Sequence, residues 1–505
     1  MLDRRRLLGR AAALAAMQFL AGGMRARPAQ SRVRTTVDPF ALGVASGEPT
    51  ADGFVLWTRI AGMTEDRTVG YEIAEDAGFR RIVRHGRALS PAARGGAVHL
   101  EVRGLEPGRP YFYRFHFGEA VSRTGTVATI APAPERLRLA LTSCQHWEHG
   151  WFSAYRDMIA AGVEAVLQVG DYIYERSFGA GPNVRSFGAG DPQTLEDYRA
   201  RHALYRSDPD LAAAHAAMPF LVSWDDHEVE NDYLADRAGY TADPQAFVRR
   251  RAAAYRAYFE HMPLRPSALR PGGEVRLYRS TSWGDLAAAH ILDTRQYRTP
   301  SACIAEGETA GGPIARCARA GEDVGSMLGP AQEAWFARTV AERPVRWSLV
   351  TQQTLFARLA LPEGPNSLYP QFWDGYAAAR TRMLDALEAA NTRNAVILGG
   401  DVHSFWINDV KRDFARSDSA AVATEIVTSC LASHNGPEAL FGPAPALNPH
   451  VRFLNNTHAG YVLLDIRRDR IEGMLRAVSD LADSQATCRE LRTFTIEDRR
   501  PGALL

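Results

Sequence analysis

The stretch Val163-Glu-Ala-Val-Leu-Gln-Val-Gly-Asp-Tyr-Ile-Tyr174 is an apolar run that ends at a glycine and continues into polar and aromatic residues. A short apolar run bounded by a turn residue is typical of a strand in the interior of a sheet, so we expect residues 163–169 to form one. Gly170 lets the chain turn sharply at the strand end and leaves Asp171 exposed at its tip. Tyr174 follows three residues later, and its phenol can face the same point.

Strand-like and helical stretches alternate around this strand. The further strands are expected at residues 137–141, 219–224, 286–292, 347–350, 395–398, 424–427 and 462–466, and helical stretches at 151–161, 191–217 and 246–259. This alternation predicts an α/β layered domain, with mixed sheets sandwiched by helices.

The residues before this domain have a different pattern. Alternating runs at 54–60 and 97–102, and aromatic residues that alternate after a Pro-Gly turn, predict short strands. Tyr111, just past that turn, resembles the tyrosine corner of immunoglobulin-like and fibronectin III-like sandwiches. We therefore expect a β-sandwich of this type at residues 36–131, and a second, larger domain at residues 136–505 after a short proline-rich linker.

Residues 1–30 are predicted to be an export signal. Asp3-Arg-Arg-Arg-Leu-Leu8 precedes a mainly apolar stretch at residues 11–23, which is shorter than the ~20 residues of a membrane span. Adjacent arginines followed by two leucines resemble a twin-arginine signal, and a plain secretory signal is the alternative. We expect a periplasmic or secreted protein that meets the twin-arginine translocase during export and has no transmembrane span in its mature form.

Composition and charge narrow the class of protein. The 505 residues are 46% apolar and 23% charged, which excludes a disordered chain, a collagen and a coiled coil. The net charge is +1. The sequence has no long run of charged residues of one sign, so we expect no stable nucleic-acid complex. Cleavage after Ala29 would remove six arginines and one aspartate and leave a mature charge of −4.

The five cysteines are an odd number for an exported protein. Cys303 and Cys317 lie fourteen residues apart around a glycine-rich stretch and are expected to form a disulfide. Cys430 and Cys488 are candidates for a second one. Cys144 is left over at the end of a strand-like run, where it is either an inert core residue or a functional ligand.

Polar segments follow four of the predicted strands, at residues 142–146, 169–174, 223–233 and 398–404. Ligand sites of layered α/β folds form at such strand ends. Asp171 can bridge two cations, a Tyr174 phenolate suits ferric iron, and Asp401 with His403 forms a mixed ligand set for a two-metal site. The carbonyl of Asn231 suits a divalent ion such as Ca²⁺. A helix cap, a turn aspartate or a salt-bridged loop would explain each segment separately, but not all four together.

These segments resemble the binuclear metallophosphoesterases and, more closely, the PhoD-like alkaline phosphatase D family. Segments that carry the closer resemblance include Leu56-Trp-Thr-Arg59, Ser143-Cys-Gln145, Gly170-Asp-Tyr-Ile-Tyr174, Trp224-Asp-Asp-His227 and Gly399-Gly-Asp-Val-His403. The resemblance implies Fe³⁺ held by Cys144, Asp171, Tyr174 and His403, and Ca²⁺ held by Asp171 as the bridging ligand, Asn231 and Asp401. It places no ligands for a further Ca²⁺.

The same resemblance implies an exported, metal-dependent alkaline phosphatase or phosphodiesterase that acts on small phosphate esters through a metal-activated hydroxide. Arg295 can bind a phosphate oxygen, or form a structural ion pair with Asp293 or another carboxylate. His146 and His227 are candidate acids for the leaving group. A tail at residues 492–505 that covers the site as a lid would favour small substrates.

Other functions stay open on the sequence. A phospholipase D-like phosphodiesterase acting on lipid or polymer diesters is an alternative within the family. An exported iron redox protein is an alternative of another class, because cysteine, tyrosine and histidine also bind iron in electron-transfer proteins. A non-catalytic binding module is disfavoured by the set of candidate ligands at all four strand ends.

Overall fold

The computed structural model describes residues 38–505 except 180, 305–310, 365–366, 393 and 417. The predicted export signal lies outside the described residues. Across the described ranges, no helix is both long enough and apolar enough to cross a membrane.

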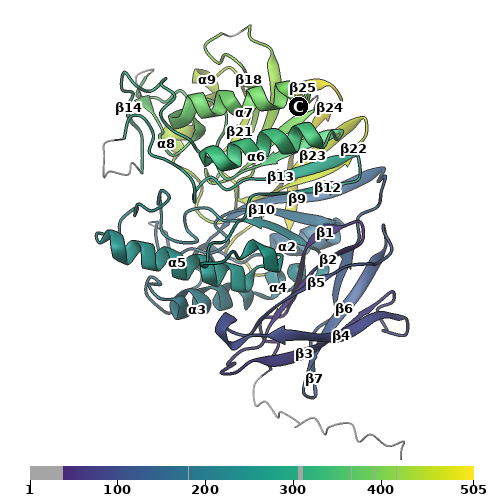
Figure 1. Cartoon of the computed structure of the whole chain (residues 1–505). Helices are drawn as coiled ribbons and strands as arrows, with labels where there is room; N and C mark the ends of the chain where they lie inside the picture. Colours follow the sequence, from purple (N-terminus) through teal and green to yellow (C-terminus); the bar gives the residue numbers. More distant parts are fainter. Residues whose placement is uncertain (1–37, 180, 305–310, 365–366, 393, 417) are drawn as a thin grey trace, which may run out of the picture.

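Two large mixed sheets form the centre of the molecule (Figure 1). The first runs in the order β11 (Phe220–Ser223), β10 (Ala165–Val169), β9 (Arg136–Gln145), β22 (Gly460–Arg467), β23 (Arg470–Val478), β24 (Cys488–Glu497) and β25 (Arg500–Leu504), with β20 (Cys430–Ala432) also pairing with β9. The second runs in the order β12 (Arg279–Trp283), β13 (Ala287–Ile291), β15 (Trp347–Thr351), β17 (Ala395–Gly399), β19 (Ala421–Val427), β18 (Phe405–Lys411) and β21 (Val451–Asn455).

The two sheets face each other across one apolar core. Leu139 and Leu167 of the first sheet and Leu349 and Val396 of the second belong to the same cluster of fully buried side chains. Strands β9, β10 and β11 are mutually parallel, as are β13, β15, β17 and β19. Parallel strands covered on both faces read as continuous apolar runs, which is why their positions follow from the sequence.

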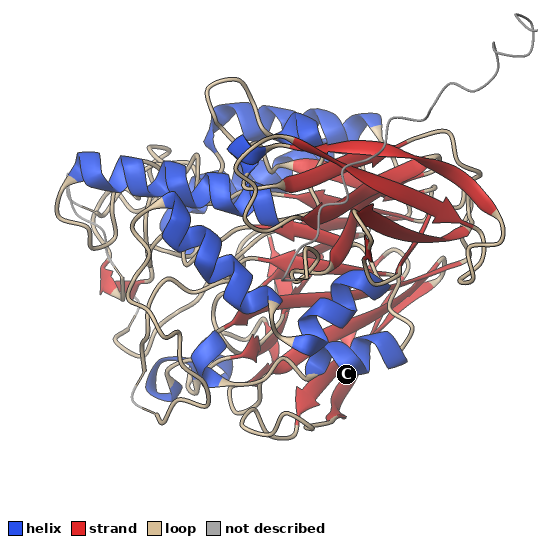
Figure 2. Cartoon of the chain, turned by 90° about the horizontal axis from the view of Figure 1, so that it is seen from below, coloured by secondary structure: helices blue, strands red, loops and turns tan. Residues whose placement is uncertain are grey.

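Helices cover the outer faces of both sheets (Figure 2). The first sheet carries α2 (Ala154–Ala160), α3 (Leu195–Arg206), α4 (Pro209–Ala217) and α5 (Pro244–His261), and the second carries α6 (Gly329–Glu342) and α7 (Ala377–Ala389). Short helices α8 (Glu438–Phe441) and α9 (Ala444–Leu447), and the strand pair β14 (Ile314–Ala315) and β16 (Ser367–Leu368), lie in connecting segments. The expected layered α/β class is therefore what the structure has.

The helical stretch expected at residues 191–217 is two helices. Thr194 opens α3 with a capping box, in which its side chain accepts from the Asp197 N–H and Asp197 returns a bond to the Thr194 backbone. The Asp208 carboxylate accepts from the N–H groups of Asp210 and Leu211 and opens α4, which has a proline in its first turn. The Asp208-Pro209 pair therefore divides the stretch.

The N-terminal described region has two smaller sheets. One contains β1 (Val44–Thr50), β2 (Gly53–Arg59) and β5 (Ala97–Val102), and the other contains β3 (Arg67–Ala74), β4 (Ile82–Ser90), β6 (Pro110–Phe117), β7 (Ala120–Val121) and β8 (Gly125–Ala128). Phe54 and Phe115, from different sheets, share one core cluster. The Tyr111 hydroxyl donates to the Glu106 carbonyl oxygen and accepts from the Glu106 N–H at 3.1 Å, as a tyrosine corner does. The assignment to an immunoglobulin or fibronectin III type stays a prediction.

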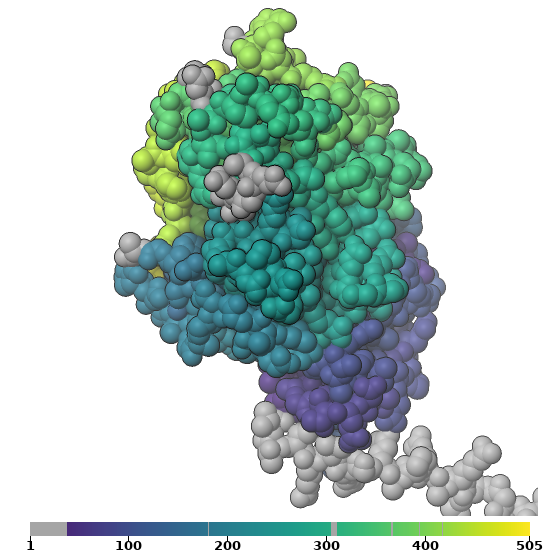
Figure 3. All heavy atoms as spheres, turned by 60° about the vertical axis from the view of Figure 1, so that its left-hand side comes forward, coloured from purple at the N-terminus to yellow at the C-terminus, as the bar shows by residue number. Residues whose placement is uncertain are grey.

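This N-terminal region, purple in Figure 3, lies directly against the larger domain, and its core cluster includes Ala216 of α4. Trp57 of β2 is fully buried, and its indole N–H donates to the Glu260 carbonyl oxygen near the end of α5 at 3.0 Å. The Arg206 guanidinium lies 4.5 Å from the centre of the Trp57 ring. Trp57 therefore joins the two regions by burial, a hydrogen bond and a cation–π contact.

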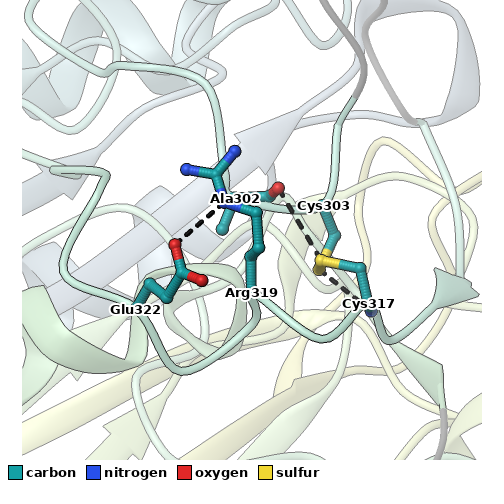
Figure 4. The surroundings of a disulfide bond; sticks show 5 residues. All are labelled: Ala302, Cys303, Cys317, Arg319 and Glu322. Atoms are coloured by element: carbon teal, nitrogen blue, oxygen red, sulfur yellow. Dashed lines mark hydrogen bonds and ion pairs between the residues drawn. A yellow bond between two sulfur atoms is a disulfide. The ribbon is translucent and has the colours of Figure 1, made fainter.

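One of the two expected disulfides is present. Cys303 and Cys317 are bonded (Figure 4), which confirms the first pairing. The pairing of Cys430 with Cys488 is wrong, because both cysteines are free. The Cys430 sulfur instead contacts the Ser433 carbonyl oxygen at 3.2 Å.

The C-terminal tail is not a lid, so that expectation is also wrong. Residues 488–497 and 500–504 form β24 and β25 at the edge of the first sheet. The Gly502 N–H donates to the Thr424 hydroxyl of β19 at 2.9 Å. The tail closes one edge of the sheet sandwich because alternating residues such as Phe494 and Ile496 point into its core.

We expect Trp57→Ala to lower the free energy of unfolding by about 3–5 kcal/mol, because it leaves a cavity and an unpaired Glu260 carbonyl group at the junction. Urea unfolding followed by circular dichroism measures this. Leu89→Ala is the control: Leu89 is 56% exposed on β4, and its replacement should change stability by less than about 0.5 kcal/mol. Equal stability of the two variants would contradict the assigned role of Trp57.

Candidate metal centre

The candidate ligands come together because strand ends of both sheets meet at one edge. Cys144 lies at the end of β9, and Asp171 and Asp225 follow β10 and β11 of the first sheet. Asp401 and His403 follow β17 of the second sheet. Parallel strands present their carboxyl ends on the same side, so two facing sheets can supply one site from both halves.

Two glycines allow these strand ends to approach closely. A Cβ on Gly170 would lie 2.4 Å from the Asp225 Cβ, and φ at Gly170 is +112°, which L-amino acids rarely adopt. A Cβ on Gly400 would lie 2.3 Å from the Ser143 hydroxyl oxygen. The first glycine brings together the loops after β10 and β11, and the second brings together the two sheets.

Several candidate ligands have an unusual backbone conformation. Cys144, Asp171, Asp401 and His403 have φ values of 55°, 55°, 68° and 53°. They are four of only ten non-glycine residues with positive φ in the described part of the chain. The left-handed region is unfavourable for such residues, and strained positions cluster at functional sites. The strain here re-aims each side chain at a strand end toward a common centre.

One buried carboxylate holds two of the loops in place. Glu228 accepts the N–H groups of Tyr172 at 2.6 Å, Asp225 at 2.7 Å, Asp171 at 3.0 Å and Ile173 at 3.2 Å. The first of its oxygens bonds Tyr172 and Ile173, and the second bonds Asp171 and Asp225. Glu228 therefore fixes the loop after β10 against the loop after β11, and it stabilises the strained conformation at Asp171.

The four residues expected to hold iron lie together. The Tyr174 hydroxyl oxygen is 3.0 Å from Asp171 Oδ2 and 3.1 Å from His403 Nε2. The Cys144 sulfur is 3.4 Å from Asp171 Oδ2. Donor atoms of Cys144, Asp171 and His403 all lie within 4.8 Å of one another. Thiolate, phenolate, carboxylate and imidazole together form a donor set that suits a transition-metal ion.

His403 is oriented as a ligand. Its Nδ1 lies 2.7 Å from the His434 carbonyl oxygen and donates to it, which leaves the Nε2 lone pair directed toward Tyr174. Burial lowers the pKa of His403 to about 4, although the bond to His434 opposes the shift, so the ring is neutral. Metal-binding histidines have this arrangement, in which the second nitrogen donates to a backbone carbonyl group.

A second group of donors extends from the first. Asp171, Asp226 and His227 offer donor atoms within 4.8 Å of one another, and Asp225, Asp226 and Asp401 form a third such group. Asp171 belongs to the first two groups and Asp226 to the last two. The three groups therefore form a continuous row of oxygen, nitrogen and sulfur donors, which we call the metal row.

The electrostatics of this row favour bound cations. Burial raises the pKa of Asp171 well above its usual range, and Asp226 and Asp225 raise it further although His227 opposes them. Burial also raises the pKa values of Asp225 and Asp401, against the effect of Arg295. Cations would offset both effects. One buried oxygen of Asp226, Oδ1, has no hydrogen-bond partner in the described ranges, so the donor set fits bound metal ions.

Arg295 lies within this row. It is 1% exposed, its Nε donates to Asp225, and its Nη2 lies 3.4 Å from Asp226 Oδ1. Its backbone N–H, not its guanidinium, contacts Asp293 at 3.0 Å. Arg295 thus forms a structural ion pair with Asp225 and Asp226, which is the role that the sequence offered as the alternative to phosphate binding.

His227 faces an opening beside the row. Its Nδ1 lies 2.7 Å from Glu175 Oε2, and the ring lines a pocket of about 410 Å³ together with Phe178, Asn231 and Tyr240. Burial lowers the pKa of His227, but the charge of Glu175 and then that of Asp171 outweigh burial and raise it well above its usual range. His227 therefore combines a proton-bearing ring with access to the pocket.

His146 has no free ring nitrogen. Its Nδ1 accepts from the Glu148 N–H, and its Nε2 lies 3.1 Å from the Arg176 carbonyl oxygen. Burial, reinforced by His149, lowers its pKa to about 2. The ring centre lies 4.6 Å from that of Tyr174. This geometry is that of a packing partner for the Tyr174 ring, and it favours His227 over His146 as the leaving-group acid.

Asn231 lies at the pocket rather than in the row. Its amide donates to Asp232 Oδ2 at 2.7 Å, and its backbone N–H donates to Glu175 Oε1 at 3.0 Å. The placement brings Asn231 beside His227. The expected Ca²⁺ site of Asp171, Asn231 and Asp401 stays a prediction, and among the described donor groups Asp401 lies with Asp225 and Asp226.

Sequence reasoning missed the roles of Asp225, Asp226 and Glu228. The signal was visible as a run of acidic residues directly after a buried strand. Residue type alone does not separate the two aspartates, whose oxygens face the row, from Glu228, whose oxygens accept backbone N–H groups. That difference depends on where the neighbouring loop lies.

Comparisons with known proteins agree along the chain. The family model described as PhoD-like phosphatase matches residues 139–475, and that of its N-terminal domain matches residues 26–131. The chain is 37% identical over 488 residues to "Alkaline phosphatase D" of Bacillus subtilis (strain 168), covering 92% of this chain and 82% of that protein.

Solved structures support the same relationship. The structure titled "Structure of PhoD" matches with a TM-score of 0.87 and 35% identity, covering 93% of this chain and 92% of that one. One titled "GAP50 the anchor in the inner membrane complex of Plasmodium" has a TM-score of only 0.39 and 9% identity over 73% of this chain and 90% of that one. The chain belongs to the PhoD-like phosphatase family.

Proposed function

We propose that this chain hydrolyses phosphate esters at the row of metal-binding residues, with ions held between the two sheets. Membership of the PhoD-like family identifies it as a phosphoric ester hydrolase. The observation that carries the metal assignment is the overlap of the three donor groups, which share Asp171 and Asp226. Adjacent ions in such a row can contact the same phosphate group.

The ion at the sulfur-containing end is Fe³⁺ in this proposal. Cys144, Asp171, Tyr174 and His403 would hold it, and the short distances from Tyr174 to Asp171 and His403 support a phenolate ligand. At the all-oxygen end, Asp225, Asp226 and Asp401 fit Ca²⁺, which prefers carboxylate ligands. Asp171 would bridge toward a middle ion, with Asp226 and the nearby Asn231 as further ligands.

When bound, these ions neutralise phosphate charge and lower the pKa of water. The chain's own side chains would then orient the metal-binding carboxylates and protonate the leaving oxygen. Arg295 holds Asp225 and Asp226 in the geometry seen here and keeps one guanidinium nitrogen, Nη1, on Gln371 at 3.2 Å. His227, supported by Glu175, lies where it can give a proton to a leaving oxygen in the pocket. We retain Arg295 as a candidate phosphate contact that would form once ions occupy the carboxylates.

The pocket of about 410 Å³ beside His227 suits small phosphate esters. Because the C-terminal tail forms strands and does not cover the site, a phosphodiester with two substituents can also enter. We therefore propose both phosphomonoesterase and phosphodiesterase activity, with a phospholipase D-like diester substrate as the second candidate.

We also propose the chain organisation inferred from the sequence. Residues 1–30 would be a twin-arginine export signal, residues 36–131 an immunoglobulin or fibronectin III-like sandwich, and residues 136–505 the catalytic domain. The protein would act in the periplasm or outside the cell after passage through the twin-arginine translocase. Fusing residues 1–37 to a reporter enzyme and following its export with and without Arg5→Lys/Arg6→Lys tests the signal.

Asp171→Asn should lower kcat on p-nitrophenyl phosphate and its bis-ester by at least about 100-fold, because both the iron and the middle site lose a bridging ligand. Metal content by elemental analysis should fall with it. Asp157→Asn is the matched control, since Asp157 is an aspartate of α2 that pairs with Arg476 outside the site. Near-wild-type turnover and metal content in Asp171→Asn would reject the bridging role.

Tyr174→Phe should remove the visible absorption band that a phenolate-to-Fe³⁺ charge transfer produces. Tyr172→Phe serves as the control, because Tyr172 is equally buried two residues away and its hydroxyl contacts His215 Nε2 at 2.8 Å. That variant should keep the band. A spectrum unchanged in Tyr174→Phe, or a protein with no band at all when iron is present, would exclude Tyr174 as an iron ligand.

A calcium chelator should inhibit hydrolysis reversibly, and added Ca²⁺ should restore it. Asp226→Asn should raise the Ca²⁺ concentration needed for half-maximal activity by at least about tenfold, because Asp226 belongs to two donor groups. Asp157→Asn again provides the control. Full activity after complete removal of calcium would take Ca²⁺ out of the proposal and leave the iron site standing.

A further inference from the structure

A groove lies where the N-terminal sandwich meets the edge of the second sheet. It has a volume of about 450 Å³ and is lined by the end of β1, by β12 and by the C-terminal part of α6. Its lining shares no residue with the three donor groups of the metal row. The groove is therefore a separate feature of the molecule.

The lining of the groove is strongly basic. It contains five arginines and a single carboxylate, that of Glu48. Glu48 pairs with Arg265 at 3.1 Å and with Arg279 at 2.7 Å. The other three have no carboxylate partner in the parts of the chain that the structure describes: Arg270, Arg276 and Arg343. The groove thus carries an uncompensated positive charge in a protein whose mature net charge would be negative.

The floor of the groove has buried polar atoms without partners. Arg279 uses Nη1 for the carbonyl oxygens of Val222 and Leu277, at 3.0 and 2.7 Å. Its Nε forms the ion pair with Glu48, whereas its Nη2 is buried and has no hydrogen-bond partner among the described residues. The Ser282 hydroxyl is in the same state. Unpaired buried donors are costly, so a bound group with acceptor oxygens would stabilise this floor.

The rim is partly organised before any ligand binds. The Arg276 guanidinium lies 4.1 Å from the centre of the Tyr278 ring, which restrains the side chain. The Ser280 hydroxyl lies 3.2 Å from His290 Nδ1 on the neighbouring strand, beside Ser282. Hydroxyl groups at the floor and guanidinium groups above them are the donors that phosphate recognition uses.

We propose that this groove binds a small anion that carries one or more phosphate groups, at a site distinct from the metal row. Arginine forks match the geometry of phosphate oxygens, and the volume falls within the range of small-molecule sites. The position at the junction of two regions is also one where ligand sites are common. Binding here does not depend on hydrolysis, so the inference stands or falls independently of the proposed function.

The test uses the full-length mature protein carrying Asp171→Asn. The protein is also dialysed against a chelator, because Asp225, Asp226 and Asp401 could still hold an ion. Without ions, the carboxylate-rich row repels anions, so binding at the groove can be measured alone. Isothermal titration calorimetry with inorganic pyrophosphate, which this variant would not hydrolyse, and with inorganic phosphate gives the affinity for two and for one phosphate group. We expect one site per chain for pyrophosphate, and weaker binding for phosphate.

Adding Arg276→Gln and Arg343→Gln should weaken pyrophosphate binding by at least about tenfold, because two charged donors are lost. Adding Arg338→Gln is the matched control: Arg338 is an exposed arginine of α6 outside the groove lining, and its loss removes charge close by. Affinity should be unchanged there. Without Asp171→Asn, the Arg276/Arg343 variant should keep wild-type turnover of p-nitrophenyl phosphate, which checks folding.

Three results would overturn the proposal. They are no pyrophosphate binding to the Asp171→Asn protein, equal binding with and without the two groove substitutions, and equal weakening by Arg338→Gln. If the double variant fails to fold, Ser282→Ala provides the second measurement. It removes one floor hydroxyl and should weaken binding several-fold, and unchanged affinity there would again count against the site.

Discussion

The site depends on how the buried carboxylate of Glu228 is satisfied. This carboxylate sits among apolar strands and accepts four backbone N–H groups, three from the loop after β10 and one from the loop after β11. Burial raises its pKa to about 7, although the same N–H bonds oppose the shift. These bonds compensate the loss of hydration only if both loops keep one geometry, and that geometry directs Asp171 into the metal row.

The two facing sheets impose the second constraint. Cys144 and Asp171 come from one sheet, whereas Asp401 and His403 come from the other, so the row exists only if the sheets keep their relative position. The close contact of Gly400 with Ser143, and the apolar core between the sheets, hold that position. Close-packed interiors do not deform continuously, so strained left-handed residues at the strand ends can persist.

Much of the fold could be predicted from the sequence because the parallel strands are buried on both faces. Their apolar runs are continuous, and each one ends at a recognisable glycine or polar segment. The four residues proposed to hold iron could be named from the sequence because their spacing resembles a known family, not because the spacing alone determines a site. What each polar side chain in residues 223–233 contacts could not be predicted, because whether Asp226 or Glu228 faces the row depends on where the neighbouring loop lies.

The errors have the same origin in tertiary structure. The count of cysteines favours a pairing of Cys430 with Cys488, but both are free, and no local pattern reports which cysteines meet in the fold. The tail was expected to cover the site, but its alternating apolar residues fit the edge of the first sheet. Strand order and sheet closure depend on contacts between residues far apart in the sequence. One amino-acid sequence taken by itself contains little information on such contacts.

Local charge, rather than net charge, determines where an anion can approach this protein. A mature chain of charge −4 would repel phosphate esters on average, and its metal row contains several buried carboxylates. Ions held in the row would reverse that local sign, because several positive charges would replace the repulsion of a few aspartates. The arginine groove reverses the sign by a different route, through three arginines that have no carboxylate partner among the described residues. Removal of metal should therefore abolish the attraction of anions to the metal row and leave their attraction to the groove intact, since only the row depends on bound ions.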